Sequence, residues 1–233
     1  LRVLMYHKVD ETKRNFLCVK STQLKEQLLY IKSKYVPIKL TELLDHIEKG
    51  TSIPDNAILI TFDDGYENNY TLAYPIFKAL SIPFTIFTVN SFIGKKANHD
   101  SIEQAFLSED QILKMVNLVD FAHHGLKHDN LMDLSPEKRE LEISESVKEM
   151  QTFKHKTINA WAYTYGAYPK KNQTEFEGLK LAFKKSGISC AFRIGNRINK
   201  LPIKDPYKIE RIDVRGDESF FRFRLKVGFG KIL

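Results

Sequence analysis

The sequence predicts an α/β fold, a distorted (β/α) barrel of about seven parallel strands. Short apolar runs alternate with amphipathic segments along the chain, which is the pattern of strands joined by crossover helices. There are seven such runs, close to the strand count of a closed barrel. The chain has 233 residues, 42% of them hydrophobic, which is enough to build a large core without disulfide bonds.

The expected elements follow one another in a regular order. The expected strands are residues 2–6, 57–62, 84–89, 118–122, 160–163, 188–194 and 208–214. The expected helices are residues 21–35, 41–49, 69–80, 108–117, 136–152 and 173–186. Ser108 with Gln111 forms a predicted capping box, and Ser135 before Pro136 is a second helix start. Polar residues directly after the strands should meet at one mouth of the barrel, where such folds carry chemistry.

The last residues are expected to lie outside the catalytic unit. We assign residues 1–217 to the barrel and residues 218–233 to a C-terminal tail. Residues 221–227 alternate aromatic or aliphatic side chains with basic ones, and a period of two predicts a strand. We expect this strand to dock on the barrel; the alternative is that it brings the protein to an anionic envelope.

Composition excludes some classes of function. Lys and Arg number 36 against 29 Asp and Glu, a net charge of +7, but the basic residues are dispersed in short pairs. We therefore expect solvated faces, compatible with peripheral association with an anionic envelope, and no nucleic-acid footprint. The two cysteines form no metal-binding pair, no apolar run approaches a membrane span, and no signal segment is present in this chain.

The first candidate motif is a pair of adjacent carboxylates. The apolar run 57–62 ends in Asp63, Asp64 and Gly65. Neighbouring side chains of a continuing strand point to opposite faces, so the two aspartates can share a site only where the chain turns. Gly65 permits such a turn. The plain alternative is an ordinary polar loop after a strand.

The second candidate motif is a histidine pair after the run 118–122. A spacing of four places His124 and His128 on one face of a helical turn, where one ion can accept a nitrogen from each. His123 is the competing ligand. One carboxylate with two imidazoles suits zinc, iron, cobalt or nickel, and it leaves a second aspartate free to take a proton from water.

These motifs carry a family resemblance. The segments TFDDG (61–65), HGLKH (124–128) and LMYHKV (4–9), with residues 163–166 and 210–214, resemble the polysaccharide deacetylase superfamily of carbohydrate esterases, or NodB-homology family. The resemblance covers residues 1–215 and is closest to the exopolysaccharide N-deacetylase subset. It implies an extracellular or cell-envelope location and an N-acetylated polysaccharide or oligosaccharide as substrate.

The resemblance also implies roles for individual residues. Asp63 would be the general base that acts on metal-activated water, and Asp64, His124 and His128 would hold one divalent ion. Zinc is the first choice for that ion, with cobalt or nickel as alternatives. The backbone N–H of Tyr165 would help to bind the oxyanion while an N-acetyl group is removed from an amino-sugar polymer.

The chain departs from the family pattern at two points. Thr164 stands where many relatives have proline, which predicts a less rigid loop. Many relatives also carry a general-acid histidine in a late strand, but the last histidine here is His155. We expect His7, at the end of the run 2–6, to supply that acid, as the subset with a related N-terminal element is understood to do; a structural role capping the strand is the alternative.

Other residues are candidates for supporting roles. Arg211 is expected to pair with Asp63 and keep it ionised, or else to form a surface salt bridge. Four aromatic residues at or near the expected strand 160–163 could stack on sugar rings, although packing is the commoner role for such residues; these are Trp161, Tyr163, Tyr165 and Tyr168. Two alternative functions remain: hydrolysis of small amides or imides on the same barrel, and carbohydrate binding without catalysis.

Overall fold

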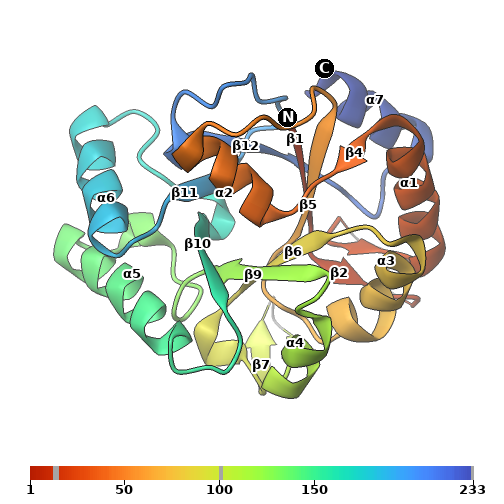
Figure 1. Cartoon of the computed structure of the whole chain (residues 1–233). Coiled ribbons are helices and arrows are strands. Elements are labelled where there is room, and N and C mark those ends of the chain that lie inside the picture. Colours follow the sequence, from red (N-terminus) through yellow and green to blue (C-terminus); the bar gives the residue numbers. More distant parts are fainter. Residues whose placement is uncertain (13–15, 100–101, 232–233) are drawn as a thin grey trace.

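Seven parallel strands close into a barrel in the computed structural model, which describes residues 1–12, 16–99 and 102–231 (Figure 1). The strands follow the order β1-β12-β11-β10-β9-β6-β5, and β5 pairs with β1 to close the ring. The predicted fold class is therefore confirmed. The barrel strands are β1 (Arg2–Tyr6), β5 (Ala57–Phe62), β6 (Phe84–Thr88), β9 (Val119–His123), β10 (Thr157–Ala162), β11 (Cys190–Ile194) and β12 (Ile209–Asp213).

Helices surround the barrel close to the predicted positions. They are α1 (Ser21–Lys34), α2 (Leu40–Lys49), α3 (Tyr74–Leu80), α4 (Glu109–Met115), α5 (Pro136–Met150), α6 (Gln173–Lys185) and α7 (Phe220–Phe229). A π-helical turn, Asn69–Ala73, leads into α3. Single 3-10 turns lie at Asn90–Phe92, Leu131–Asp133, Thr164–Gly166 and Pro206–Lys208. Ser108 and Gln111 form the expected capping box at the start of α4.

Short strands occur outside the barrel ring. β4 (Val36–Pro37) pairs with β5, and β2 (Lys8–Val9) pairs with β3 (Cys18–Val19). An antiparallel hairpin of β7 (Lys96–His99) and β8 (Ile102–Ala105) lies between β6 and α4. None of these strands was predicted, because two to four residues are too few to show a period.

Side-chain alternation divides the buried residues of the barrel into two sets. On β5, Ala57 and Leu59 belong to the cluster inside the barrel, whereas Ile58 and Ile60 pack outward with α1 and α3. All six residues of β5 are buried, as expected for a parallel strand covered on both faces. This alternation continues past the strand ends and decides which polar side chains enter the mouth.

The tail forms helix α7, so the predicted strand at 221–227 is wrong. Ser219 caps the helix, because its Oγ accepts a hydrogen bond from the backbone N–H of Arg222 at 3.2 Å. Phe223 and Val227 lie four residues apart and are both buried. The ring of Phe223 lies 6.3 Å from that of Tyr30 on α1. The tail thus packs against α1 through a helical stripe, which the alternating basic residues obscured.

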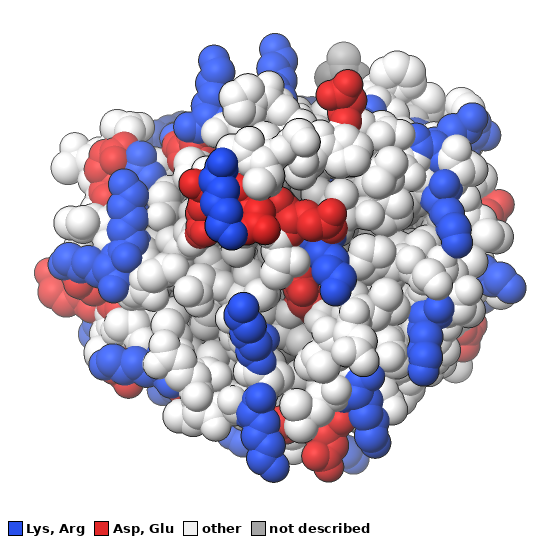
Figure 2. Space-filling model, viewed as in Figure 1, with Lys and Arg blue, Asp and Glu red and all other residues white. Residues whose placement is uncertain are grey.

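Lys and Arg do not gather into one patch on the face that Figure 2 shows; they lie apart among uncharged atoms, whereas Asp and Glu form one group in the upper middle of this view. Several of these charges are paired on the surface, such as Lys185 with Glu140 at 2.9 Å. No helix among the described residues is both long and apolar enough to cross a membrane.

Candidate active site

Strand alternation brings three of the predicted residues to the inside of the mouth. Asp63 continues the inward series of β5, and His7 continues the inward series of β1 through Val3 and Met5. Arg211 follows Ile209 on the same face of β12. His7 and Arg211 therefore come from neighbouring strands of the barrel, although they are 204 positions apart in the sequence.

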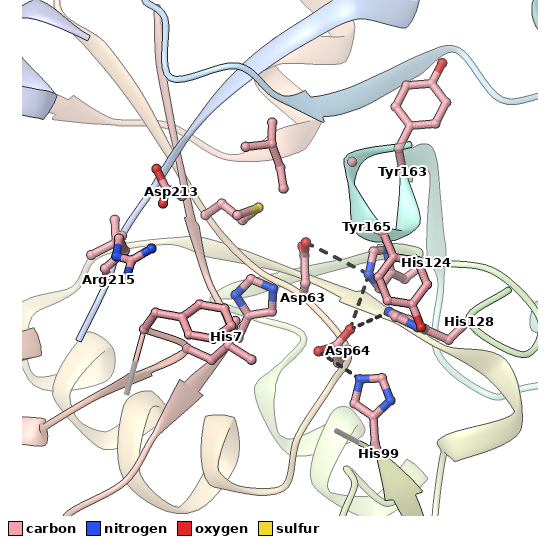
Figure 3. A pocket seen from close by; sticks show the side chains of 16 residues that line it. His7, Asp63, Asp64, His99, His124, His128, Tyr163, Tyr165, Asp213 and Arg215 are labelled. Carbon is pink, nitrogen blue, oxygen red and sulfur yellow. Dashed lines mark hydrogen bonds and ion pairs between the residues drawn. The ribbon is translucent and has the colours of Figure 1, made fainter. Parts of the chain in front are cut away.

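The chain turns sharply at the paired aspartates, as the sequence required. Asp64 has φ 72° and Gly65 has φ 77°, both in the left-handed region. A Cβ on residue 65 would lie 3.0 Å from Cγ2 of Thr88, so only glycine fits without movement of a neighbour. The turn places both carboxylates in one pocket (Figure 3).

A buried arginine fixes the first aspartate. Arg211 donates two hydrogen bonds to Asp63, Nη1 to Oδ1 at 2.6 Å and Nη2 to Oδ2 at 2.8 Å. Arg211 is fully buried, so the expected pairing is confirmed and the alternative of a surface salt bridge is wrong. Burial raises the pKa of Asp63, but Arg211 and then His124 outweigh it and hold that pKa below its ordinary value.

The histidine pair lies on a loop, and the helical turn predicted for it is wrong. β9 ends at His123, and the following residues are irregular, with φ 95° at Gly125 and φ 64° at His128. Glu142 on α5 holds the loop, because its Oε1 accepts backbone hydrogen bonds from Leu126 at 2.7 Å and from Lys127 at 3.3 Å. The two imidazoles meet through this loop geometry instead of helical spacing.

Both imidazoles reach one oxygen of the second aspartate. Asp64 Oδ1 lies 3.3 Å from His124 Nε2 and 3.1 Å from His128 Nε2 (Figure 3). His123, the competing ligand, does not line this pocket; its ring stacks on Trp161 with centroids 6.0 Å apart. Alternation at the end of β9 thus selects His124 over His123.

The donor set fits a divalent cation. Nδ1 of His124 lies 2.9 Å from the carbonyl oxygen of Ala162, which can only accept, so this nitrogen carries the proton and Nε2 presents a lone pair. In the neutral ring, that lone pair faces the carboxylate of Asp64, which is itself an acceptor. Among the described residues, buried Oδ1 of Asp64 has no partner of proper hydrogen-bond geometry. A cation between these atoms would satisfy both.

The electrostatics agree with this view. Burial lowers the pKa of His124, but Asp63 and Asp64 outweigh it and raise that pKa above the ordinary value. Burial likewise raises the pKa of Asp64, whereas its contacts with His124, His128 and His99 bring that pKa well below the ordinary value. The protein alone thus needs positive charge beside Asp64, which a proton or a metal ion can supply.

A model of the polysaccharide deacetylase family matches residues 51–183, more than half of the chain. The chain belongs to the polysaccharide deacetylase family. It is 29% identical over 212 residues to the poly-beta-1,6-N-acetyl-D-glucosamine N-deacetylase of Staphylococcus epidermidis, which covers 85% of this chain and 68% of that protein. A polysaccharide deacetylase homologue of Bacillus subtilis is 27% identical over 170 residues, and the chain spans only 57% of its length.

Solved structures share the fold. The Streptococcus pyogenes deacetylase PplD in complex with acetate superimposes with a TM-score of 0.80 and 19% identity, covering 97% of both chains. IcaB from Ammonifex degensii gives a TM-score of 0.80 with 20% identity, covering 97% of this chain and 95% of that one.

Within this deacetylase fold the 3-10 turn after β10 borders the metal-ligand candidates. Tyr165 has φ 56°, and its Oη lies 3.1 Å from Nδ1 of His128. Thr164 is buried and donates from Oγ1 to the carbonyl oxygen of Asp129 at 2.6 Å, a bond that proline could not make. The hydroxyl therefore ties this turn to the histidine loop where we expected a looser segment.

Backbone strain concentrates at this site. Five described residues other than glycine have positive φ, and three of them, Asp64, His128 and Tyr165, line the same pocket. Such conformations cost on the order of 1–3 kcal/mol each and persist where function fixes them. The strain therefore marks the same residues that the motifs indicated.

Most of the aromatic residues suggested as a sugar platform are core residues. Trp161, Tyr163 and Tyr168 are at most 8% exposed and pack together with α5 and α6, so the stacking role is wrong for them. Only Tyr165, 66% exposed, presents its ring to solvent. The pocket itself is a cavity of about 330 Å³ lined by both aspartates, by His7 and by apolar side chains such as Met5 and Val214.

One residue of the pocket escaped the sequence analysis. His99, at the end of β7, lies with Nε2 3.5 Å from Asp64 Oδ2. Asp64, His99 and His128 place one ligand atom each within 4.8 Å of one another. His99 follows the expected strand 84–89 by ten residues, so the rule of searching loops after strands could have found it if applied to the whole loop.

Proposed function

We propose that this protein is a metal-dependent hydrolase that removes N-acetyl groups from an N-acetylated amino-sugar polysaccharide, acting outside the cell or at the cell envelope. The observation that carries the proposal is the contact of one Asp64 oxygen with the Nε2 atoms of His124 and His128, beside a second carboxylate on Asp63. The name of the Staphylococcus epidermidis relative supports the choice of N-acetylglucosamine polymers.

Asp64, His124 and His128 would hold one divalent ion. When bound, the ion supplies a Lewis acid that lowers the pKa of water and polarises the acetamide carbonyl. The set of one carboxylate and two imidazoles suits zinc first, with cobalt or nickel as alternatives.

Asp63 is the proposed general base. Its lowered pKa keeps it deprotonated at neutral pH, and Arg211 holds both of its oxygens, which fixes the direction from which it takes a proton. Removal of Arg211 would leave this carboxylate buried and unpaired. The base therefore depends on the arginine for both its charge and its position.

His7 is the proposed general acid, and the backbone N–H of Tyr165 is the proposed oxyanion donor. Both residues line the pocket that contains the aspartates. Burial lowers the pKa of His7, and Asp64 and Asp63 oppose that effect only in part. An imidazolium with a lowered pKa gives up its proton readily, which suits transfer to the departing sugar amine.

Acetate release from N-acetylglucosamine oligomers by metal-loaded protein tests the proposal. We expect Asp64→Ala to lose bound metal and turnover together, Asp63→Asn to keep the metal and lose turnover, and His7→Ala to keep the metal and lose roughly 10²-fold or more in turnover. His46→Ala is the control, because His46 is a half-buried histidine of α2 that does not line the pocket. An Asp64→Ala protein with unchanged metal content and turnover would refute the ligand assignment.

Release from a small N-acetylated amine or cyclic imide, measured in parallel, separates this function from the small-amide alternative. Faster turnover of the small amide than of the oligomers would contradict the proposed substrate class.

A further inference from the structure

A third imidazole lies against the carboxylate that is proposed to bind the ion. His99 Nε2 is 3.5 Å from Asp64 Oδ2, whereas His124 and His128 lie closest to the other oxygen, Oδ1. The ring centroids of His99 and His128 are 4.6 Å apart, and Figure 3 shows His99 directed at Asp64 from the side opposite His124. Imidazoles therefore flank both oxygens of Asp64.

The hairpin that carries His99 is attached to the aspartate turn itself. β7 pairs with β8 in register from Lys96 with Ala105 to His99 with Ile102. The backbone N–H of Leu107, just after the hairpin, donates to the carbonyl of Gly65 at 2.9 Å. The position of His99 relative to Asp64 is thus fixed by backbone hydrogen bonds and does not depend on a free loop.

Aromatic rings orient the imidazole of His99. The ring lies 5.4 Å from Phe92, 6.0 Å from Tyr66 and 6.2 Å from Phe106, by centroids. Phe92 and Phe106 contact each other at 4.4 Å and close this aromatic group. The side chain of His99 is only 10% exposed, so it faces the pocket and not the solvent.

We propose that His99 is a fourth protein ligand of the ion, which would then be held by Asp64, His99, His124 and His128. The proposal rests on the proposed function, because it assumes that an ion binds there. Asp64, His99 and His128 already place ligand atoms within 4.8 Å of one another, and His124 Nε2 touches Asp64 Oδ1. His124 lies outside the group whose ligand atoms are within 4.8 Å of one another, so coordination by all four requires these side chains to move toward a common centre.

A fourth ligand has a consequence for the choice of metal. Three imidazoles and one carboxylate fill the tetrahedral shell that zinc prefers, whereas a catalytic site needs an open position for water. Cobalt and nickel accept five or six ligands, so they keep room for water and substrate in this set. With His99 as a fourth ligand, the preference for zinc drawn above from three ligands gives way to cobalt or nickel for turnover.

Metal binding tests the inference independently of activity. Chelated full-length protein is titrated with Co²⁺, and affinity is measured by calorimetry and coordination by visible absorption and X-ray absorption. We expect His99→Ala to weaken Co²⁺ binding by at least about 10-fold, to change the visible spectrum, and to lower the number of bound imidazoles from three to two. His46→Ala serves as the matched control with one histidine fewer.

His99→Gln separates a ligand from a residue that only orients Asp64. Glutamine can donate a hydrogen bond to Asp64 Oδ2 but offers no imidazole nitrogen, so it should not restore affinity if His99 binds the ion. Wild-type affinity and imidazole count in His99→Ala, or full recovery in His99→Gln, overturns the inference. In those cases loss of metal and turnover in Asp64→Ala would still support the proposed function, whereas wild-type protein that binds no Co²⁺ overturns both.

Discussion

His123 and His124 are neighbours in the chain, but they belong to two different regions of the molecule. His124 enters the charged mouth of the barrel, and His123 enters a pocket without carboxylates between the barrel and α5 that also contains Met150 and His155. The two histidines are equally buried, at 1% and 2% exposure. Their partners differ: His124 meets two carboxylates, and His123 meets the indole of Trp161.

The comparison shows that burial alone does not set the chemistry of an imidazole. Burial lowers the pKa of His123 to about 4, with a smaller contribution from His155. The same burial at His124 is outweighed by Asp63 and Asp64, and its pKa rises. One region stabilises positive charge and the other excludes it, although a single peptide bond joins them.

The largest expected effect is on turnover when each histidine is replaced in turn. His124→Ala should lower acetate release by more than about 100-fold, beyond the 10- to 100-fold loss that removal of a residue supporting a ligand causes. His123→Phe keeps a ring against Trp161 and should release acetate at nearly the wild-type rate. Steady-state assays, with metal content measured on the same samples, give the turnover of both variants. Equal losses of turnover in the two variants would contradict the different roles of His123 and His124.

The next largest effect concerns the buried ion pair of the mouth. Arg211→Met leaves Asp63 buried and unpaired, and we expect it to lower the free energy of unfolding by about 3–5 kcal/mol. The double variant Asp63→Asn with Arg211→Met removes both charges and should regain part of that loss. Urea unfolding measures both, and an Arg211→Met protein within about 0.5 kcal/mol of wild type would show that the pair is not needed for stability.

His123 should contribute to the pH dependence of stability. The unfolded chain has a His123 pKa near 6.5 and the folded protein about 4, so between these values the unfolded state binds more protons. Stability therefore falls as the pH drops from 6.5, by about 2 kcal/mol at pH 5. Burial also lowers the pKa of His155, which adds in the same direction.

Urea unfolding of chelated protein at pH 7.5 and pH 5 measures this dependence. His123→Phe should reduce the difference between the two pH values relative to wild type. An unchanged difference in that variant would assign the pH dependence to other groups.

The smallest expected effects distinguish two tyrosines, Tyr165 and Tyr163, which should affect metal affinity and stability respectively. Tyr165→Phe removes the 3.1 Å contact with His128 Nδ1 and should weaken metal binding by roughly 10-fold, with little change in stability because Tyr165 is largely exposed. Tyr163→Phe removes a buried hydrogen bond to the carbonyl of Tyr207 and should cost about 1 kcal/mol of stability without changing metal affinity. Calorimetric titration measures the metal affinity of both variants, and urea unfolding measures their stability. A loss of stability in Tyr165→Phe or a loss of affinity in Tyr163→Phe would contradict this separation.

Much of the barrel could be predicted because its strands are apolar runs and because helices such as α4 and α5 begin with a capping serine. The period of two in β5 explains why Asp63 faces inward, whereas its pairing with Arg211 was one of two alternatives that the sequence left open. To predict that His124 lies in the mouth and His123 outside it, the exact end of β9 must be known, because that end places His124 on the inner face. Spacing alone could not supply that boundary.

Other features depend on contacts distant in sequence. The hairpin that carries His99 has strands of four residues and is held by bonds to the aspartate turn, which no local pattern reveals. In the tail, Arg and Phe alternate, yet the buried positions are Phe223 and Val227, because packing on α1 selected the helix. Tertiary contacts overrode the local period in the tail, and in the hairpin they act where no local period exists.

Closure of the barrel has a consequence for when the site forms during folding. β1 lies between β5 and β12, so the first strand of the chain closes the ring by pairing with both β5 and the last barrel strand, β12. The counter-ion of Asp63 arrives only with β12, 148 residues later. A chain still lacking that final strand would hold an unneutralised carboxylate at an open seam, so hydrolytic competence should appear only once β12 has been made and the ring has closed.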